Sequence, residues 1–365
     1  MDRKILKKMI LLLAAAVMLL AGCGSTGNAD AETVPMKHRV TLTQEETVRK
    51  KTFQQNQDFS EFLESSRQGF YIPGLAQHMI PQGISASGET GLTYISSYAA
   101  SPLVSSVITA VDSETGVLKA EYWLYHADGS PFSGHVGGIA AAGNYLYLSA
   151  EPDESGSCQI AQIDLGKLPR EGGYKLTLDT FFRVQTKPSF LNASEGYLLA
   201  GNFYHPKGKY DLPDTVQHTV PSADGEQGCF ILGYPLTDGG ELSCDAGQPK
   251  AKFVLSAPDR IQGICCREDR IYLSQSYGRK NNSAILQYSV QDLAPAPEPV
   301  TIDGEKLPAY ILDSRSLCGQ LTAMPMTEGL CMGPDHTVTV LFESGAKKYQ
   351  DGRDRTDRVW YLNLP

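Results

Sequence analysis

Short apolar runs separated by turns return five times along the chain, and they predict strands. Each repeat opens with a small residue followed by an apolar one, at Gly83-Ile84, Gly138-Ile139, Ser189-Phe190, Gly263-Ile264 and Gly329-Leu330. Second runs follow at 93–96, 146–149, 198–201, 271–274 and 338–341, and third runs at 107–111, 159–163, 230–234, 284–288 and 359–362. Apolar side chains alternate with small or polar ones in these runs, which is typical of sheets that pack face to face.

Repeated short strands at this spacing are typical of a β-propeller in which each repeat forms one blade. Fourth, outer strands are expected at 117–124, 175–184, 252–255 and 300–302. The last repeat reaches the end of the chain, so we expect its outer strand to come from Gly69–Ile72 or from the segment before it. The sequence therefore predicts an all-β fold, a five-bladed β-propeller. Six blades is the alternative if residues 40–80 contain a degenerate blade.

The first residues have the pattern of an export signal. Arg3, Lys4, Lys7 and Lys8 precede an apolar stretch from Met9 to Leu20, which is too short to span a bilayer as a resident helix. The stretch ends in Leu20-Ala21-Gly22-Cys23, which resembles a bacterial lipobox. The resemblance implies that residues 1–22 are a lipoprotein signal peptide and that Cys23 carries a diacylglyceryl group. We therefore expect a lipid-anchored protein on the extracytoplasmic face of the cell membrane.

Three further segments follow the signal. Residues 23–42 are rich in Gly, Ser, Thr, Asn and Ala and read as a flexible tether. Residues 43–70 are expected to form a helical N-terminal extension, because Thr43 precedes two glutamates and apolar residues follow at helical spacing. The alternative for this segment is a mobile stalk. Residues 71–365 are assigned to the propeller.

Composition and net charge limit the classes of partner that the protein is expected to bind. Hydrophobic residues make up 41% of the chain, which is enough for a substantial core, and the net charge of −9 disfavours nucleic-acid binding. We expect a monomer. Seven cysteines remain after Cys23 without close CxxC pairs, so a zinc site is not expected. Cys265 and Cys331 each lie two residues after a repeat glycine, and a disulfide between them and buried free thiols both remain open.

Polar residues beside the repeat openings predict a site on the propeller axis. The first residues of the innermost strands reach one mouth of the central channel of a propeller, and here they are Gln82, His135, Ser189, Gln262 and Glu328. Such a ring could hold a small ligand or a divalent cation, although a wet channel also favours polar residues. No cofactor is predicted.

The ends of the second strands supply another ring of candidates. It combines aromatic rings with amide and charged groups, which suits sugar rings or a peptide: Tyr98, Asn202, Phe203, Tyr204, His205, Tyr277 and Arg279. Tyrosine is also common at strand ends for structural reasons.

Signatures of catalysis are weak. The chain lacks the G-x-S-x-G and H-E-x-x-H patterns of serine hydrolases and zinc proteases. Carboxylate partners in a propeller come from different blades, and the first pairs to compare are Glu328 with Glu151 and Glu328 with Glu343.

Two segments resemble the signatures of a group of secreted and lipid-anchored bacterial β-propeller proteins. One is His135 to Ile139 with Gly143 to Ser149, and the other is Arg260 to Ile264 with Arg270 to Arg279. The chain is also distantly similar to lactonase-like and strictosidine-synthase-like propellers. Their inner metal ligands are Glu, Asn, Asn and Asp, whereas Gln82, Ser189 and Gln262 stand in such places here. The likeness therefore implies a fold and carries over no lactonase activity.

Two hypotheses of function follow. The first is a ligand-binding or scaffolding module that recognises a cell-wall glycan, a peptide or a protein. The alternative is a hydrolase or lyase acting on a sugar or lactone, with His135 and Glu328 as acid–base or metal-binding groups. Enzymatic activity is left open, with binding preferred.

Overall fold

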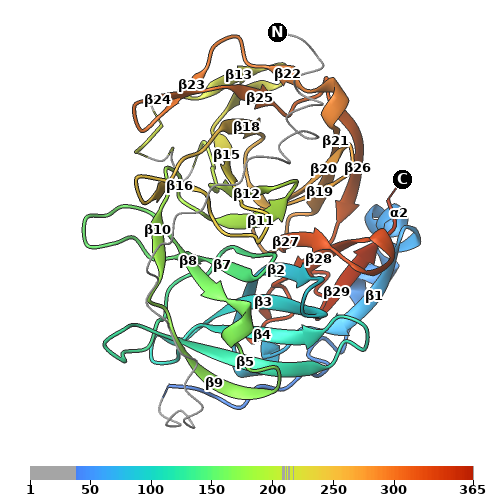
Figure 1. The fold of residues 1–365 in the computed structure, drawn as a ribbon. Coiled ribbons are helices and arrows are strands. Elements are labelled where there is room, and N and C mark those ends of the chain that lie inside the picture. Colours follow the sequence, from blue (N-terminus) through green and yellow to red (C-terminus); the bar gives the residue numbers. More distant parts are fainter. Residues whose placement is uncertain (1–37, 208–209, 211, 213, 217, 365) are drawn as a thin grey trace.

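The computed structural model describes residues 38–207, 210, 212, 214–216 and 218–364. They form a five-bladed β-propeller (Figure 1). The inner strands are β2 (Met79–Ser87), β6 (Ile139–Ala142), β11 (Phe190–Ser194), β19 (Ile261–Arg267) and β27 (Thr327–Met332). Each inner strand contacts the next, and β27 returns to β2, so the ring is closed. Six blades are excluded, because residues 40–80 complete the last and first blades and add none of their own.

Each blade adds three strands outside its inner strand. They are β3 (Leu92–Ala99), β4 (Val107–Asp112) and β5 (Leu118–Tyr125); β7 (Tyr145–Ala150), β8 (Gln159–Asp164) and β10 (Phe181–Arg183); β12 (Tyr197–Gly201), β15 (Cys229–Pro235) and β18 (Phe253–Ala257); β20 (Arg270–Gln275), β21 (Ser283–Ser289) and β26 (Leu317–Ala323); and β28 (Val338–Phe342), β29 (Arg358–Leu362) and β1 (Ser66–Tyr71). Neighbouring blades bury their apolar faces against each other, so the core lies between blades.

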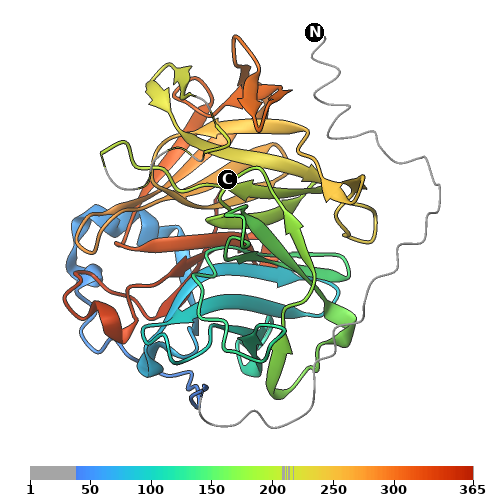
Figure 2. The ribbon, with the colours of Figure 1, turned by 90° about the vertical axis from the view of Figure 1, so that its left-hand side faces the viewer.

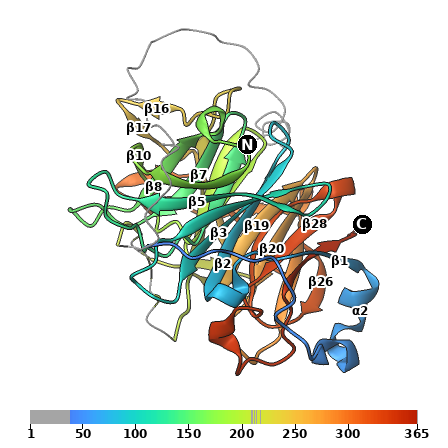
Figure 3. The ribbon, with the colours of Figure 1, turned by 90° about the horizontal axis from the view of Figure 1, so that it is seen from below.

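The N-terminal strand closes the last blade, as the sequence predicts. Strand β1 pairs antiparallel with β29, with Ser66 opposite Leu362 and Gln68 opposite Trp360. Figures 1 and 3 show β1 and α2 (Ser60–Glu64) together at the edge of the molecule, and Figure 1 shows them beside β29. The fold is thus held shut by hydrogen bonds between segments from opposite ends of the chain.

The expected helix over residues 43–70 is largely wrong. Residues 43–51 have no regular structure, short 3₁₀ turns cover Thr52–Gln55 and Gln57–Phe59, and only α2 is α-helical. The apolar residues of this segment are nevertheless buried, because the rings of Phe53 and Phe62 lie 5.7 and 5.6 Å from the ring of Trp360. The segment is packed on the propeller, which contradicts a mobile stalk for these residues.

Two predicted outer strands belong elsewhere. Residues 175–177 lie in β9 (Gly172–Thr177), which runs parallel to β5 as a fifth strand of the first blade, and only β10 completes the second blade. Residues 300–302 form β23 (Val300–Ile302), a hairpin with β24 (Glu305–Leu307), while β26 completes the fourth blade. The reason is that the long insertion turns back to the third blade, where β25 (Ala309–Ile311) pairs with β18 and with β22 (Ala294–Pro295).

Four of the repeats open with a glycine, and close contact with the neighbouring blade requires this residue. A Cβ on Gly83 would lie 2.8 Å from the amide nitrogen of Ile139, and one on Gly138 would lie 2.5 Å from that of Leu191. On Gly263 it would lie 2.9 Å from the Glu328 carbonyl oxygen, and on Gly329 it would lie 2.9 Å from the Ile84 nitrogen. The inner strands therefore approach one another with backbone facing backbone, which only glycine allows.

The serine that ends three of the second runs holds the channel walls together. The Ser96 hydroxyl donates to the Val136 carbonyl of the next blade at 2.8 Å, and the Ser274 hydroxyl donates to the Glu328 carbonyl at 2.6 Å. The Ser149 hydroxyl oxygen accepts from the Gly138 amide at 3.0 Å within its own blade. The repeated Gly and Ser positions thus build one ring of backbone around the channel.

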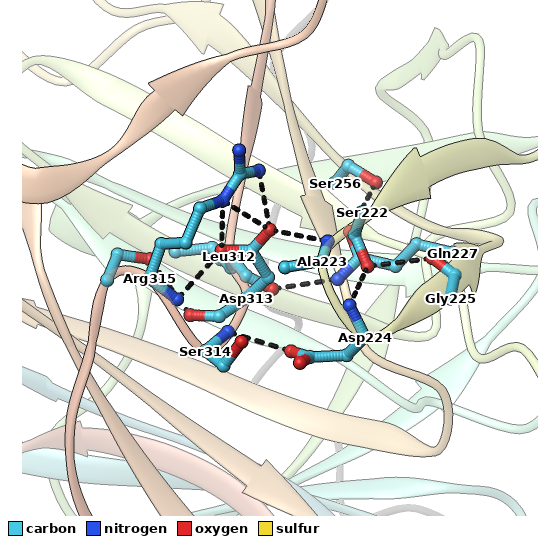
Figure 4. Close-up of polar contacts among 11 residues, drawn as sticks. Ser222, Ala223, Asp224, Gly225, Gln227, Ser256, Leu312, Asp313, Ser314 and Arg315 are labelled. Atoms are coloured by element: carbon cyan, nitrogen blue, oxygen red, sulfur yellow. Dashed lines mark hydrogen bonds and ion pairs between the residues drawn. The ribbon is translucent and has the colours of Figure 1, made fainter.

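A buried carboxylate fastens an insertion of the third blade. The insertion contains a hairpin of β13 (Val220–Ser222) and β14 (Gly225–Gln227), which lies beside the β23–β24 hairpin at one end of the molecule (Figure 2). Asp313, only 1% exposed, accepts from the Ala223 amide at 3.0 Å and from Arg315 Nη2 at 2.6 Å (Figure 4). The Gln227 amide donates to the Leu312 carbonyl at 2.8 Å. The hairpin is therefore tied to residues 312–315.

We expect Asp313→Ala to lower the free energy of unfolding by about 2–3 kcal/mol, because it leaves the Ala223 amide without its acceptor and removes a charge-assisted bond to Arg315. Urea denaturation followed by fluorescence measures this change. Asp238→Ala, in an exposed turn, is the control and should change stability by less than about 0.5 kcal/mol. Equal stabilities of the two variants would contradict this assignment.

The seven cysteines of the described region are free thiols, and Cys265 and Cys331 are buried. The structure therefore has buried free thiols at Cys265 and Cys331, and the alternative of a disulfide between them is wrong. Burial raises the pKa of both, so neither is activated as a nucleophile. Cys23, the signal peptide and residues 23–37 of the tether lie outside the described residues. Within the described part of the chain, no helix is long and apolar enough to cross a membrane.

Candidate ligand site at the mouth of the central channel

Three inner strands carry a β-bulge at the mouth of the channel. The pairing of β2 with β3 skips Gln82, and the pairing of β19 with β20 skips Gln262. The pairing of β27 with β28 is irregular between Thr327 and Leu330, where Glu328 lies. A bulge adds an unpaired residue and re-aims its side chain. The residue before each of these repeat glycines is therefore turned out of the ladder.

These side chains share one cavity of about 1450 Å³ at the axis. Ten residues of the two predicted rings line it: Gln82, Tyr98, His135, Ser189, Asn202, Phe203, Gln262, Tyr277, Arg279 and Glu328. The structure places Tyr204 differently. A Cβ on Gly228 would lie 2.7 Å from the Tyr204 ring, and this ring packs with the apolar residues between the third and fourth blades.

A pair of carboxyl groups forms the floor of the cavity. Glu328 is buried, and its carboxyl group is hydrogen-bonded to that of Glu343, which directly follows β28 and keeps part of its surface open. The Gln82 side-chain amide donates to Glu343 Oε2 at 3.0 Å, and the Gln262 amide approaches Glu328 Oε1 at 3.5 Å. Two carboxyl groups can bond to each other only when one of them holds a proton, so the pair shares one.

The surroundings stabilise the protonated form of this pair. Burial and then the negative charge of Glu343 raise the pKa of Glu328 well above its usual value. Burial raises the pKa of Glu343 to about 7, against the opposing effects of hydrogen bonds from Tyr349 and Gln82 and of the positive charges of Lys348 and Arg279. The pKa of Glu343 therefore lies near neutral pH, and both carboxyl groups of the cavity floor hold a proton more tightly than an exposed glutamate does.

A basic and aromatic cluster lies beside the pair. Tyr349 is hydrogen-bonded to Glu343 and to Tyr98. The Lys348 ammonium donates to the Tyr98 hydroxyl at 3.0 Å and lies 5.3 Å from the centre of the Tyr349 ring. Arg279 lies 4.9 Å from that ring and is fixed by Asp351 at 2.8 Å. These contacts hold the cations in place on the cavity wall.

His135 packs against Tyr98 at the same mouth of the channel. Its ring is 4.7 Å from the Tyr98 ring, and the residue is exposed to the cavity. Desolvation by the cavity walls, and then the charges of Lys348 and Lys187, hold the pKa of His135 below its usual value. His135 is therefore neutral at pH 7. The partner of Glu328 is Glu343, one of the two carboxylates singled out from the sequence, and Glu151 lies elsewhere on the lining.

Phe203 and Tyr277 form an aromatic wall of the cavity, and His205 packs against it without lining the cavity. The rings of Phe203 and Tyr277 are stacked at 6.4 Å, and His205 meets Tyr277 edge-on at 4.4 Å. Asn202 is buried and bonded to main chain, since its amide donates to the Gly228 carbonyl at 3.0 Å and its oxygen accepts from the Phe230 amide at 2.7 Å. Asn202 therefore shapes the wall, while the rings offer a surface to a ligand.

Sequence reasoning missed Lys187, Lys348 and Tyr349. Lys187 lies two residues before the opening of the third repeat, and the other two lie in the long loop between β28 and β29. The Lys347-Lys348-Tyr349 run in that loop is a signal that could have been used, because it combines charge and an aromatic ring at a blade end. Among the described residues, no group of three or more His, Cys, Asp and Glu side chains could hold a metal ion.

Comparison with solved structures finds remote neighbours. A putative oxidoreductase (glucose dehydrogenase) from Thermus thermophilus is 13% identical, with a TM-score of 0.41 over 81% of this chain and 99% of that chain. The GH43_1 enzyme from Xanthomonas citri complexed with xylotriose is also 13% identical, with a TM-score of 0.41 over 81% of this chain and 89% of that chain. The β-propeller domain of Cps50 (Swd1) from Myceliophteria thermophila is 10% identical, with a TM-score of 0.35 over 79% of this chain and 99% of that chain.

Comparisons with protein-family models and with curated proteins give no match. The resemblance to a group of secreted bacterial propellers thus stays a prediction. The similarity to the solved structures is too low to transfer an activity, and the cavity itself has to support any statement about function.

Proposed function

We propose that the protein is a lipid-anchored, extracytoplasmic propeller that binds a glycan in its central cavity. The observation that carries the proposal is the combination of a proton-sharing carboxyl pair on the cavity floor with aromatic rings on its wall. Binding is favoured over catalysis because the two carboxyl groups of the pair are hydrogen-bonded to each other.

The chemistry of the lining suits a ligand rich in hydroxyl groups. A half-protonated carboxyl pair both donates and accepts hydrogen bonds, and so do the side-chain amides of Gln82 and Gln262 beside it. The rings of Tyr98, Phe203 and Tyr277 present faces on which the C–H groups of sugar rings can pack. A cavity of about 1450 Å³ exceeds what one small ligand needs, so an oligosaccharide is a better fit than a single sugar.

Isothermal titration calorimetry with a panel of oligosaccharides tests this proposal. At least one should bind, and Tyr277→Ala should weaken that binding about tenfold, because an aromatic contact contributes on the order of 1 kcal/mol. Phe181→Ala is the matched control, since Phe181 is an exposed ring on β10 that does not line the cavity. The proposal fails if no oligosaccharide binds, or if the two variants bind equally well.

A hydrolase or lyase is the second candidate, and one observation favours it. Glu343, with a pKa of about 7, could donate or accept a proton at neutral pH. However, glycosidases keep their two carboxyl groups about 5–9 Å apart to admit the sugar or a water, whereas Glu328 and Glu343 are bonded to each other. If the protein is an enzyme, Glu343→Gln should abolish turnover of the bound oligosaccharide. Release of products by that variant would remove this candidate.

The anchor is a separate part of the proposal with its own test. Cys23→Ser should abolish incorporation of labelled palmitate and move the protein from the membrane fraction to the soluble extracytoplasmic fraction, because two acyl chains give stable anchoring and the signal peptide alone does not. Labelling of the Cys23→Ser protein, or its retention in the membrane, would contradict lipid attachment at this residue.

A further inference from the structure

Four basic side chains line the cavity, and two of them have no acidic partner. Arg183 is paired with Asp153 at 2.8 Å, and Arg279 is paired with Asp351 at 2.8 Å. Lys187 and Lys348 also line the cavity, and within the described part of the chain neither ammonium lies within 4.0 Å of a carboxylate. In a chain with a net charge of −9, two cations without an ion-pair partner in one cavity are unusual.

Lys348 is held in place without an ion pair, although its charge acts on the carboxyl group of Glu343. Its ammonium donates one hydrogen bond to the Tyr98 hydroxyl at 3.0 Å and lies 5.1 and 5.3 Å from the centres of the Tyr98 and Tyr349 rings. An ammonium has three donors, so further donors remain for a ligand. Both rings lie at the cavity wall, so these donors are placed beside the space that a ligand would fill.

The charges of both lysines act on the same residue, His135. Tyr98, which holds Lys348, lies 4.7 Å from His135, and the charges acting on His135 come from Lys348 and Lys187, one from the fifth blade and one from the entry to the third. No carboxylate is among the groups that shift the pKa of His135. Lys187 and Lys348 therefore both place positive charge near His135.

We propose that Lys187 and Lys348 form a subsite for an anionic group of the ligand, so that the glycan bound in the cavity is an acidic one that carries carboxylate or phosphate groups. This inference rests on the proposed glycan-binding function. The neutral His135 ring supplies a further donor or acceptor at the subsite, and the carboxyl pair on the floor meets the uncharged hydroxyl groups.

Matched ligands test the subsite by calorimetry on the whole protein. The probes are trigalacturonate, its carboxyl-reduced counterpart, glucose 6-phosphate and glucose. We expect an acidic probe to bind at least tenfold more tightly than its neutral counterpart at low salt, and the difference to shrink as salt screens the charges. Preference for trigalacturonate assigns the anion as carboxylate, and preference for glucose 6-phosphate assigns it as phosphate.

Variants identify the residues responsible. Lys187→Gln and Lys348→Gln should each lower affinity for the acidic probe about tenfold and leave affinity for the neutral one unchanged. Arg183→Gln removes a positive charge of the same cavity that is already paired, and it should keep the preference. Equal binding of acidic and neutral probes overturns the subsite and leaves glycan binding standing. Binding of none of the probes counts against both, and an unchanged preference in the two lysine variants overturns the subsite alone.

Discussion

A Gly329→Val protein should fail to form a stable closed propeller. A Cβ at residue 329 would lie 2.9 Å from the Ile84 nitrogen and 3.1 Å from the Gly83 Cα, which are backbone atoms of the first blade. The backbone there is held on both sides by strand pairing, so it cannot move aside as a flexible side chain could. Valine adds two further methyl groups at the same place.

The expected cost is large compared with the stability of a domain. Overpacking of a well-packed core costs about 1–3 kcal/mol or more, and here the clash separates the last blade from the first. Against a total stability of about 5–15 kcal/mol, we expect a loss of at least about 3 kcal/mol or no folded protein. Urea denaturation followed by circular dichroism measures it.

The control is Gly88→Val. Gly88 lies in the turn after β2, has no atom within 4 Å of the added Cβ and does not need a left-handed backbone. This variant should stay within about 0.5 kcal/mol of the natural protein. If Gly329→Val were as stable as Gly88→Val, the explanation of the repeat glycine as a contact between blades would be wrong.

Raising the pH from about 5 to about 8.5 should destabilise the protein through the carboxyl pair. Glu343 has a pKa of about 7 in the folded protein and about 4.3 when unfolded, so the folded state binds the proton more tightly. The stabilisation is complete below about pH 4.3 and is lost as the pH rises through 7. The shift corresponds to a loss of up to about 3 kcal/mol.

His135 acts in the opposite direction at lower pH. Its folded pKa lies below its unfolded value, so the neutral ring favours folding above the unfolded pKa of about 6.5, and this contribution is lost as the pH falls. The ring is exposed to the cavity, where water screens it, so its effect should be the smaller one. The decrease in the free energy of unfolding between about pH 6.5 and about pH 8.5 is therefore caused by the carboxyl pair.

Glu343→Gln isolates the contribution of the pair. The amide cannot ionise, so the free energy of unfolding of this variant should fall less steeply as the pH rises through 7, and only the contribution of the buried Glu328 carboxyl group should remain. Glu151→Gln, another glutamate of the same lining, should keep the slope of the natural protein. A slope in Glu343→Gln as steep as that of the natural protein would show that Glu343 is not the group that titrates near pH 7.

The architecture could be predicted because its signals are local. The five Gly/Ser-apolar openings are separated by short alternating runs, and each opening marks an inner strand. The mouth residues could be predicted for the same reason, since Gln82, Gln262 and Glu328 each precede a repeat glycine. Two of the outer strands could not, because β9 and β25 pair with strands of another repeat through parallel ladders that leave no local pattern.

The partners within the site depend on tertiary contacts. Nothing in the spacing of Glu328 and Glu343 distinguishes them from Glu328 and Glu151, because blade geometry decides which side chains meet. Lys187, Lys348 and Tyr349 lie in connections whose sequence does not follow the repeat. The helix expected from Thr43 failed because the short apolar stripe is buried by packing on Trp360 without needing a continuous helix.

The most direct measurement is a carbon-13 NMR titration of the glutamate side-chain carboxyl groups, with Glu343→Gln used to assign the pair. The account predicts one carboxyl resonance that titrates near pH 7 and disappears in the variant, and a shift of that resonance when an oligosaccharide binds. If every glutamate titrated near its ordinary value of about 4.3, Glu328 and Glu343 would not share a proton at the cavity floor, and the proposed site would lose its foundation.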